Sequence, residues 1–360
     1  MLRSNRTLPP DPDSDATQPV NSLPPDSSLV IGLIEAFRSS KVMFVAVSLG
    51  IFDFLERAPA SAESLASEFG CQPEPLERLL DASVGLGLLH KHGGKYRNQA
   101  AASTYLCRAN PNTLVGYILY SDKALFPLWA HLENAIREGG PQWTQAFHQE
   151  GSIFDHFFRT DEAMQTFLNG MHGFGLLSSP RVVSAFDLSP YKKLIDLGGA
   201  TGHLAIAACE QNPGLSAILF DLPRVIDMVR HQVSLSPVAS RIELMEGDFF
   251  CYEQIPPADL FGLSRILHDW PDEKASGLLR AIYERLPSGG GILLAEKLLN
   301  EDKTGPIPAQ LQSLNMLVCT EGKERTLTEF RVLLESAGFT EVRGQITGAP
   351  LDAIFAIKPL

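Results

Sequence analysis

The alternation of strand-like and helix-like segments after Tyr191 constrains the fold more than any other feature of the sequence. Short apolar runs suited to strands are KKLIDLGG, SAILFDL, RIELMEGDFF, ADLFGLSRIL and GGILLAEKLL. Helical stretches are ATGHLAIAACEQNP, PRVIDMVRHQV, DEKASGLLRAIYERL and TLTEFRVLLESAGF, and EVRGQITGAPLDAIFAIKP suits a terminal hairpin. Repeated strand–helix units predict an α/β domain with a parallel sheet covered by helices on both faces. Its ligands are expected beyond the carboxyl ends of the strands.

Length and composition predict further segments before this domain. The 360 residues exceed the ~250–300 at which a single core usually stops growing. We expect a disordered tail at residues 1–27, because this stretch is rich in Pro, Asp and Ser and lacks the apolar centre of a signal peptide. A mainly α, winged-helix-like dimerisation domain is expected at 28–110, a helical linker and substrate-pocket segment at 111–190, and the ligand-binding domain at 191–360.

Residues 60–98 have the pattern of a winged helix, with two helices followed by the hairpin HKHGGKYRN. Such a unit can bind DNA through its second helix. Here that helix carries Glu74, Glu77 and Asp81 against Arg78, so it would repel phosphate and a structural or dimerisation role is favoured. Residues 28–58 are apolar on more than one helical face, which favours covering by a partner subunit over ordinary intrachain core.

The cysteines indicate a reducing compartment. Their number is odd, they lie far apart, and no CxxC or Cys/His spacing suited to zinc is present. We therefore expect a cytoplasmic protein without a structural metal. No uninterrupted apolar run approaches the ~20 residues of a membrane span. The net charge of −12 argues against nucleic acid or an anionic membrane as a partner.

The sharpest motif is DLGGATG, residues 196–202, which follows an apolar strand and opens a helix. Gly198, Gly199 and Gly202 leave room for the backbone to approach a ligand. The dinucleotide fingerprint would need glycine at positions 200 and 203, where this chain has Ala and His, so a nicotinamide or flavin ligand is disfavoured. Asp196 would repel a pyrophosphate, but it suits a ligand that carries a positive charge and an amino group.

Two further strand ends carry residues suited to a nucleoside. Asp221, in LFDLP, can accept hydrogen bonds from both hydroxyls of a ribose. In EGDFF, Asp248 can accept from an adenine amino group and Phe249 can pack on the ring. Each acid alone is more often a helix cap or loop residue. Three successive strand ends with suitable acids indicate S-adenosylmethionine as the ligand.

His268 is the candidate base of the reaction. Nine histidines are present, and an isolated one is usually a surface or core residue. This one, in RILHDWPDEK, follows the fourth strand and is expected beside the cofactor pocket. A phenol has a pKa near ~10, so a neutral imidazole that removes its proton would accelerate methyl transfer. Glu296 or Glu324 could orient the ring, and Asp269 could do so or bind substrate; the alternative for Glu324 is a solvated charge at a helix start.

At these residues the chain resembles the plant-type small-molecule O-methyltransferases. DLGGATG, LFDLP, EGDFF, RILHDWPDEK, LLAEK and GKERT carry the likeness. SLNMLVCTEGKERT, VVSAFDLSP and GAPLDAIFAIKP are similar to the acetylserotonin (hydroxyindole) branch of that family. The likeness spans roughly residues 28–360. It implies a metal-independent homodimer, intertwined through its N-terminal domain, with a class I methyltransferase fold: a Rossmann-like, seven-stranded sheet ending in an antiparallel hairpin.

The resemblance also implies roles for individual residues. It assigns catalysis to His268, Glu296 and Glu324. It assigns cofactor contacts to Gly198, Asp221, Asp248, Phe249 and Arg265. It assigns substrate contacts to Asp269, Asn315, Met316, Tyr120, Trp129 and Phe147. Ala200 stands where the family often has glycine, and we expect its small methyl group to be tolerated.

The preferred reaction is therefore methylation of the 5-hydroxyl of N-acetylserotonin, which gives melatonin. The aromatic-rich middle of the chain matches the family less closely, so a phenol or polyketide O-methyltransferase of secondary metabolism is the alternative. A catalytically silent, cofactor-binding regulator is an alternative of another class, which the intact His268 and its two acids disfavour. A DNA-binding regulator is the least favoured class, because of the acidic second helix.

Overall fold

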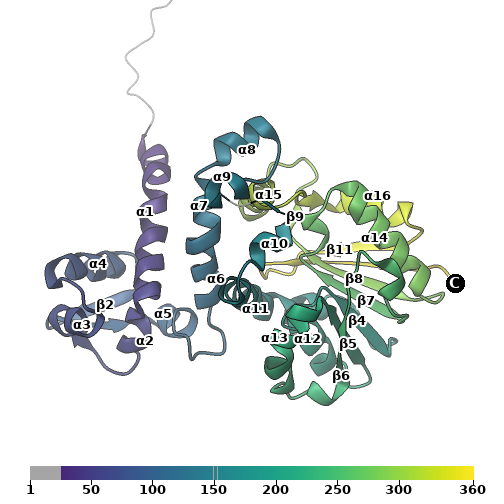
Figure 1. Ribbon diagram of the computed structural model, residues 1–360, viewed down its shortest axis with the longest axis horizontal. Helices are drawn as coiled ribbons and strands as arrows, with labels where there is room; N and C mark the ends of the chain where they lie inside the picture. The colour runs from purple at the N-terminus through teal and green to yellow at the C-terminus, as the bar shows by residue number, and fades with distance from the viewer. Residues whose placement is uncertain (1–25, 149, 152) are drawn as a thin grey trace, which may run out of the picture. The chain divides into compact units, whose positions relative to one another are not determined.

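The computed structural model describes residues 26–148, 150–151 and 153–360 (Figure 1). Most of the predicted tail, residues 1–25, lies outside the described residues. Residues 42–360 form one compact unit, and the preceding part of the first helix is described by itself. Helix α1 (Ser28–Leu49) ends at Gly50, whose φ of 81° is the left-handed conformation that glycine adopts at little cost. Helix α2 (Ile51–Leu55) follows directly.

The predicted winged-helix pattern is confirmed in residues 60–98. Helices α3 (Ala62–Phe69) and α4 (Pro73–Gly85) precede an antiparallel hairpin of β2 (Leu89–His92) and β3 (Lys95–Asn98), and β1 (Ala60–Ser61) pairs with β3. Lys91 of the hairpin forms ion pairs with Glu77 and Asp81 of α4, so two acids of the second helix serve an internal contact.

The middle of the chain is helical, as predicted. Its elements are α5 (Ala100–Tyr105), α6 (Val115–Tyr120), a π-helical turn η1 (Ser121–Leu125), α7 (Phe126–Trp129), α8 (Leu132–Glu138), α9 (Trp143–Phe147), α10 (Ile153–Phe157) and α11 (Asp161–Val183). Helix α11 begins at the Thr160 side chain, which accepts a hydrogen bond from the backbone N–H of Ala163. Aromatic side chains of this region pack together with Trp270 of the C-terminal domain.

The C-terminal domain contains the predicted seven-stranded sheet with a terminal antiparallel hairpin. Its strands are β4 (Lys193–Leu197), β5 (Ser216–Asp221), β6 (Ile242–Glu246), β7 (Leu260–Ser264), β8 (Gly291–Glu296), β11 (Thr340–Gln345) and β12 (Asp352–Ile357), in the order β11-β12-β8-β7-β4-β5-β6. Strand β12 runs antiparallel to both of its neighbours, β11 and β8. The other neighbouring strands, in the order β8-β7-β4-β5-β6, all pair in parallel. These features confirm the predicted fold class.

Helices cover both faces of this sheet (Figure 1). One apolar cluster joins the sheet to α11, α12 (His203–Gln211) and α13 (Pro223–Ser234). A second joins the other face to α14 (Asp272–Arg285) and α16 (Leu327–Ser336). Three further elements follow β8 and precede α16 in the sequence. They are helix α15 (Ile307–Cys319) and the short parallel pair of β9 (Leu298–Leu299) and β10 (Arg325–Thr326).

Two strands are shorter than the sequence pattern indicates. RIELMEGDFF is a strand only to Glu246, and ADLFGLSRIL only to Ser264. Arg265 has a φ of 58°, which turns the chain out of the sheet before the short 3₁₀ turn η4 (Leu267–Asp269). The motif residues therefore lie in loops at the carboxyl edge. The predicted domain boundaries at 27/28, 110/111 and 190/191 stay predictions. Within the described residues, no helix has the length and apolar character needed to cross a membrane.

Candidate active site

A cavity of about 480 Å³ opens at the carboxyl edge of the sheet, which is a size suited to a small organic ligand. Residues from the glycine turn and the following strand ends line it, together with aromatic side chains of the helical middle region. The former include Gly198, Ala200, Asp221, Asp248, Phe249, Arg265, His268 and Asp269. The latter include Tyr120, Phe154, Phe157, Phe158 and Phe167. A single cavity thus joins most of the predicted cofactor and substrate residues.

The glycine turn is shaped by its backbone conformation. Gly198 has a φ of 68°, and a Cβ there would come within 2.7 Å of Ile266 Cδ1. Ala200 has a φ of 48°, so this position carries the backbone cost that glycine would avoid. The sequence predicts only that the extra methyl group is small enough to be tolerated. The structure adds that the alanine backbone is held in a left-handed conformation. The backbone N–H of Ala200 donates to Asp221 Oδ2 at 2.8 Å, which joins the turn to the end of β5.

Three of the predicted cofactor residues are not among those that line the cavity. Asp196 is buried beneath the turn, and its Oδ2 accepts from the backbone N–H of Ala205 at 3.0 Å. Burial raises the pKa of Asp196 to about 7. A Cβ at Gly199 would come 2.7 Å from the Asp196 carboxyl carbon, and one at Gly202 would come 2.7 Å from Leu219. Asp196 Oδ1 is buried without a hydrogen-bond partner among the described residues, and the roles of these three residues in cofactor binding stay predictions.

Asp221 and Asp248 line the cavity at two strand ends. Both oxygens of Asp221 accept backbone hydrogen bonds, from Ala200 and Leu222, and burial raises its pKa to about 6. Asp248 accepts from the backbone N–H of Phe250 at 2.8 Å. Phe249 lies beside Phe250, with ring centroids 4.8 Å apart. The positions of the acids and the ring agree with a nucleoside site.

Arg265 lines the same cavity with unused hydrogen-bond donors. Its guanidinium lies over the Phe174 ring, 4.8 Å from the centroid. Its Nε and Nη1 atoms are buried and have no hydrogen-bond partner among the described residues. Buried guanidinium N–H groups without an acceptor are costly, so this pair of donors favours an anionic or oxygen-rich ligand.

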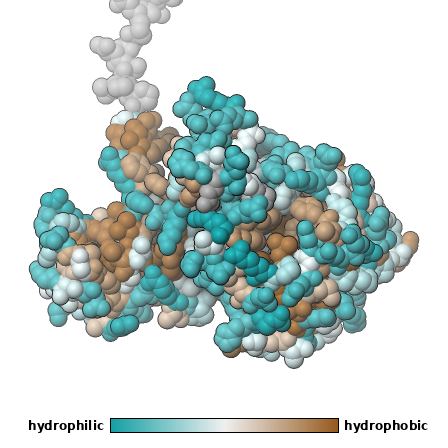
Figure 2. Space-filling model, viewed as in Figure 1, coloured by the Kyte–Doolittle hydropathy of each residue, from teal (hydrophilic) through white to brown (hydrophobic). Residues whose placement is uncertain are grey.

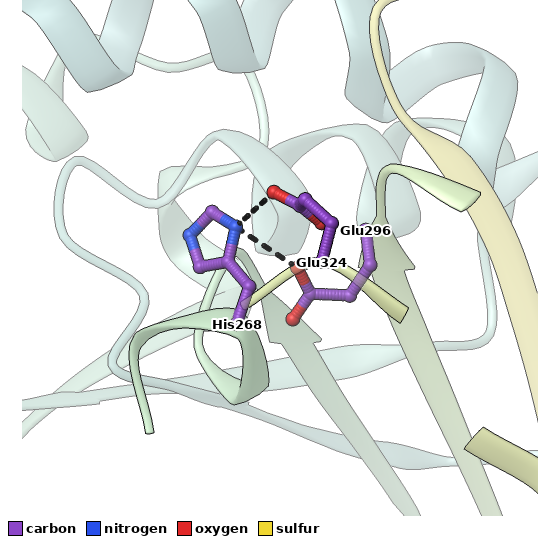
Figure 3. A group of neighbouring side chains, drawn as sticks. All are labelled: His268, Glu296 and Glu324. Atoms are coloured by element: carbon purple, nitrogen blue, oxygen red, sulfur yellow. Dashed lines mark hydrogen bonds and ion pairs between the residues drawn. The ribbon is translucent and has the colours of Figure 1, made fainter. Parts of the chain in front are cut away.

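His268 is held by carboxyl groups on one side of its ring (Figure 3). Its Nδ1 lies 2.7 Å from Glu324 Oε1 and 3.5 Å from Glu296 Oε2. Glu296 is fixed in turn, because its Oε1 accepts from the backbone N–H of Leu267 at 2.9 Å. With the proton on Nδ1 donated to Glu324, the Nε2 lone pair is free to accept a proton. Nε2 lies 3.6 Å from Asp269 Oδ1.

Burial opposes charge on every member of this group. It lowers the pKa of His268, which the Glu296 carboxylate partly offsets. It raises the pKa of Glu296 to about 7 and that of Glu324 to about 8. The imidazole is therefore neutral near pH 7, as a base must be before it takes a proton. At least one of the two carboxyls must be ionised to hold the proton on Nδ1.

A buried arginine that the sequence did not single out fixes the loop that carries His268. Arg325 Nη1 donates to Leu267 O and Nη2 donates to Trp270 O, both at 2.8 Å. Its Nε also donates to Asp272 Oδ1 at 2.9 Å. In the sequence, Arg325 follows Glu324 in a charged stretch that is typical of solvated loops, so no local signal indicates its burial.

The predicted substrate residues divide into two groups. Asp269, Asn315, Met316 and Tyr120 line the cavity. Trp129 and Phe147 are not among its lining residues, and their assignment to the substrate wall stays a prediction. Trp129 Nε1 instead donates to Asn315 Oδ1 at 2.8 Å. Because an indole N–H can only donate, this bond leaves the Asn315 amide nitrogen free to donate to a ligand.

Phe147 packs on the ring of Trp143, with centroids 5.5 Å apart, and the guanidinium of Arg159 lies over the Phe147 ring, 5.1 Å from its centroid.

Several lining residues were not singled out from the sequence: Leu125, Met171, His203, Ser264, Trp270, Lys274 and Cys319. Met171 and His203 come from helices whose core and cavity faces look alike in sequence. Two local features could have indicated that these residues line the cavity. Met171 lies one helical turn after Phe167, and His203 directly follows the glycine turn.

His268, Glu296 and Glu324 also have the composition of a metal site, because one ligand atom of each lies within 4.8 Å of the others. The 2.7 Å distance from Nδ1 to Glu324 Oε1 is that of a charge-assisted hydrogen bond. A proton on this line occupies the place where a cation would have to lie. The arrangement therefore suits an oriented base better than a metal centre.

Comparison with known proteins agrees with this geometry. The O-methyltransferase domain family matches residues 129–340, and the O-methyltransferase dimerisation domain family matches residues 31–108. Acetylserotonin O-methyltransferase of Bos taurus is 41% identical over 338 residues, which cover 92% of this chain and 97% of the bovine one.

Two solved structures extend the comparison. Human N-acetylserotonin methyltransferase in complex with SAM has a TM-score of 0.89 and 37% identity, covering 94% of this chain and 100% of that chain. Mitomycin 7-O-methyltransferase MmcR has a TM-score of 0.81 and 25% identity, covering 92% and 97%. The matched families, the shared fold and the oriented histidine lead to one conclusion: the chain belongs to the O-methyltransferase family.

Proposed function

We propose that this O-methyltransferase transfers the methyl group of S-adenosylmethionine to a hydroxyl group of a small aromatic molecule, with His268 as general base. The observation that carries the proposal is the position of His268. Its imidazole is held by Glu324 and Glu296 and lines the same cavity as the glycine turn. The human relative in complex with SAM supports the choice of methyl donor.

The lining residues fit this donor. Asp221 offers carboxylate oxygens for the ribose hydroxyls, and Asp248 and Phe249 offer an acceptor and an apolar ring for adenine. Arg265 contributes donors that lack a partner in the protein. When bound, the sulfonium supplies an already activated methyl group. Gly198 contributes through its turn, which keeps the neighbouring backbone against the cavity.

His268 would remove the acceptor's proton as the new bond to oxygen forms. Its Nε2 accepts the proton, and the ionised Glu324 stabilises the resulting imidazolium through Nδ1. A positioned base of this kind typically contributes ~10²–10⁴-fold to the rate. Glu296 keeps the ring in place, because it is itself fixed by the backbone of Leu267. Asp269, near Nε2, would hold the acceptor hydroxyl or the charged ring.

The preferred acceptor is the 5-hydroxyl of N-acetylserotonin, with melatonin as the product. The bovine and human relatives named for acetylserotonin support this choice. The aromatic wall of Phe154, Phe157 and Phe167 suits a flat indole. The free amide nitrogen of Asn315 suits a carbonyl oxygen, as the acetamide group would present.

We also propose a cytoplasmic homodimer that assembles through the N-terminal domain. The match of residues 31–108 to a dimerisation domain supports the dimer. All five cysteines, which lie in the described part of the chain, are free, and this supports a reducing compartment. In this proposal, residues 28–110 form the dimerisation domain and residues 191–360 form the cofactor-binding domain.

The test is turnover of N-acetylserotonin with methyl-labelled S-adenosylmethionine, in the presence of EDTA, by the native chain and by His268→Ala. The native protein should form labelled melatonin, and EDTA should leave its rate unchanged. The variant should lose at least ~10²-fold in kcat while its affinity for S-adenosylhomocysteine stays within about twofold. Unchanged methylation by His268→Ala would refute the base.

A second candidate is a phenol or polyketide O-methyltransferase, which the similarity to a mitomycin 7-O-methyltransferase favours. The same assay with a panel of phenols and hydroxyindoles distinguishes the two. Turnover of another phenol without turnover of N-acetylserotonin would select this candidate. Donor binding without turnover of any hydroxylated aromatic would instead select a silent, regulatory homologue.

A further inference from the structure

His203 lines the cavity but has no part in the function proposed above. It is the first residue of α12 and directly follows the glycine turn, whose last residue, Gly202, is the N-cap of the helix. Its side chain is 8% exposed, so the ring is almost wholly enclosed apart from its cavity side. An enclosed polar ring at the cavity wall needs a partner for each of its nitrogens.

One nitrogen has its partner in the protein. Nδ1 of His203 lies 2.8 Å from the hydroxyl oxygen of Ser179, which is itself buried on α11. A Cβ at Gly175 would come 2.3 Å from the His203 ring, so glycine is required there for the ring to lie against α11. Gly175 and Ser179 are four residues apart and share one face of the helix. The position and rotation of the imidazole are thus fixed by α11.

The other nitrogen has no hydrogen bond to any of the described residues. Burial, with smaller contributions from the neighbouring His172 and Arg265, lowers the pKa of His203 to about 3. The ring is therefore neutral at physiological pH and carries a single N–H. When the Ser179 hydroxyl donates to Nδ1, that N–H is on Nε2, the atom left for a ligand.

The surroundings of Nε2 indicate what it would bind. In the proposed function, Asp221, Asp248 and Phe249 take the ribose and adenine of the donor. The remaining polar end of the donor is an amino acid, whose carboxylate is its one anionic group. Arg265, with its unpartnered donors, and the N-terminus of α12 both favour a negative charge on the His203 side of the cavity.

On the basis of the proposed function, we propose that the Nε2–H of His203 donates a hydrogen bond to the carboxylate of S-adenosylmethionine. His203 is then a cofactor-binding residue, with Ser179 as the positioning residue that selects its tautomer and Gly175 as the position that makes room for its ring. The alternative is a structural role, in which the imidazole only fills the space above Gly175. In the binding role, loss of the imidazole weakens only ligands that carry the carboxylate. In the structural role, it affects ligands with and without the carboxylate equally.

The test compares S-adenosylmethionine with its decarboxylated form, which differs only in lacking that carboxylate, in calorimetric titrations without acceptor. His203→Phe keeps the ring but has no donor, and His203→Gln keeps an N–H near the position of Nε2. We expect His203→Phe to weaken binding of S-adenosylmethionine at least tenfold and to leave the decarboxylated form within about twofold. His203→Gln should bind both ligands nearly as the native chain does.

Equal weakening of both ligands by His203→Phe, or weakening of neither, would overturn the assignment. Failure of the native protein to bind S-adenosylmethionine would instead overturn the proposed function, and this inference with it. Chain folding is followed by the near-ultraviolet circular dichroism of each variant. If His203→Phe does not fold, His203→Leu, which also has no donor, replaces it in the same comparison.

Two adjacent serines provide a matched pair for the tautomer. Ser178 and Ser179 are both buried on α11, but the Ser178 hydroxyl donates to the backbone carbonyl of Phe174, whereas the Ser179 hydroxyl is the one hydrogen-bonded to His203. Ser179→Ala should weaken binding of S-adenosylmethionine severalfold, because the proton is then free to move to Nδ1. Ser178→Ala should leave it unchanged. Equal effects from the two variants would contradict the role of Ser179.

Discussion

The proton on His268 Nδ1 depends on two carboxyls whose pKa values burial has raised, to about 7 for Glu296 and about 8 for Glu324. The active form needs an ionised carboxyl beside Nδ1, so kcat of the native enzyme should rise with pH between about 6 and 8. A raised acid pKa places this rise at higher pH than for an ordinary glutamate. The apparent pKa belongs to the coupled group rather than to one residue. A pH profile of kcat measures it.

Glu324→Gln tests the origin of that rise. The amide oxygen can still accept from Nδ1–H but cannot ionise or stabilise an imidazolium. We expect the variant to lose about 10²-fold in kcat at pH 8 and to show a flatter profile through pH 6–8. Glu335→Gln, on an exposed side chain of α16 outside the cavity lining, serves as control and should retain the native profile. A native-like profile in Glu324→Gln would assign the rise to another group.

Ala200 carries a backbone cost at the glycine turn. Its φ of 48° is a left-handed conformation, which costs a non-glycine residue about 1–2 kcal/mol, and part of this is offset because alanine is less flexible than glycine when unfolded. Ala200→Gly should therefore raise the free energy of unfolding by up to about 1 kcal/mol, seen as a small rise in Tm.

Gly198→Ala provides the opposite case in the same turn. It adds a Cβ at a φ of 68° and within 2.7 Å of Ile266, so it should lower Tm. Differential scanning fluorimetry of both variants without ligand separates the two effects. A lower Tm for Ala200→Gly would mean that the methyl group has packing partners worth more than the backbone cost.

At the level of elements, Arg325 holds the loop after β7 in addition to the loop's own backbone hydrogen bonds, Asp269 N–H to Ile266 O and Trp270 N–H to Leu267 O. The Arg325 side chain is fully buried and donates to Leu267 O, Trp270 O and the Asp272 carboxylate. Arg325→Met would remove all of these donors, and only Leu267 O and the Asp272 carboxylate would keep another one within the described part of the chain, from the Trp270 N–H and from Lys323. It should lower the free energy of unfolding by about 3 kcal/mol and reduce kcat, because the loop carries His268.

The matched control for this change is Arg280→Met on the exposed face of α14. It should shift the free energy of unfolding by no more than about 0.5 kcal/mol. Urea denaturation followed by tryptophan fluorescence measures both. Similar stability of the two variants would show that the acceptors around Arg325 find other donors.

At the scale of the whole molecule, the N-terminal part of α1 exposes apolar side chains. Leu29, Leu33 and Phe37 are 74%, 69% and 54% exposed, and Figure 2 displays this apolar surface over α1. Residues 31–108 match a dimerisation domain, so we expect a second copy to cover this surface. Leu33→Glu should place a charge in the contact and raise the dimer dissociation constant at least about tenfold in sedimentation experiments.

Leu235→Glu is the control for this change, because Leu235 is equally exposed, at 72%, but lies outside the matched segment. It should leave the sedimentation coefficient unchanged. A dimer of unaltered stability in Leu33→Glu would place the contact elsewhere in the N-terminal domain.

The amino-acid sequence was sufficient to predict the class of fold and the chain positions of most reactive groups. Periodicity identifies strands and helices locally, and the carboxyl ends of parallel strands meet at one edge of a sheet. Residues such as Asp221, Asp248 and His268, placed at successive strand ends, could therefore be expected in one cavity. The sequence pattern overestimates the length of β7, because Arg265 leaves the sheet through a left-handed backbone conformation that an arginine in the sequence does not indicate.

Which side chains line the cavity follows from the three-dimensional packing of the chain. Asp196 turns beneath the loop to support α12, Trp129 acts through Asn315, and Arg325 is buried although its sequence neighbours are charged. His203 reaches the cavity because Gly175, 28 positions earlier, leaves space for its ring. The physical reason is that orientation and burial follow from packing between distant segments, whereas periodicity reports only on neighbours along the chain.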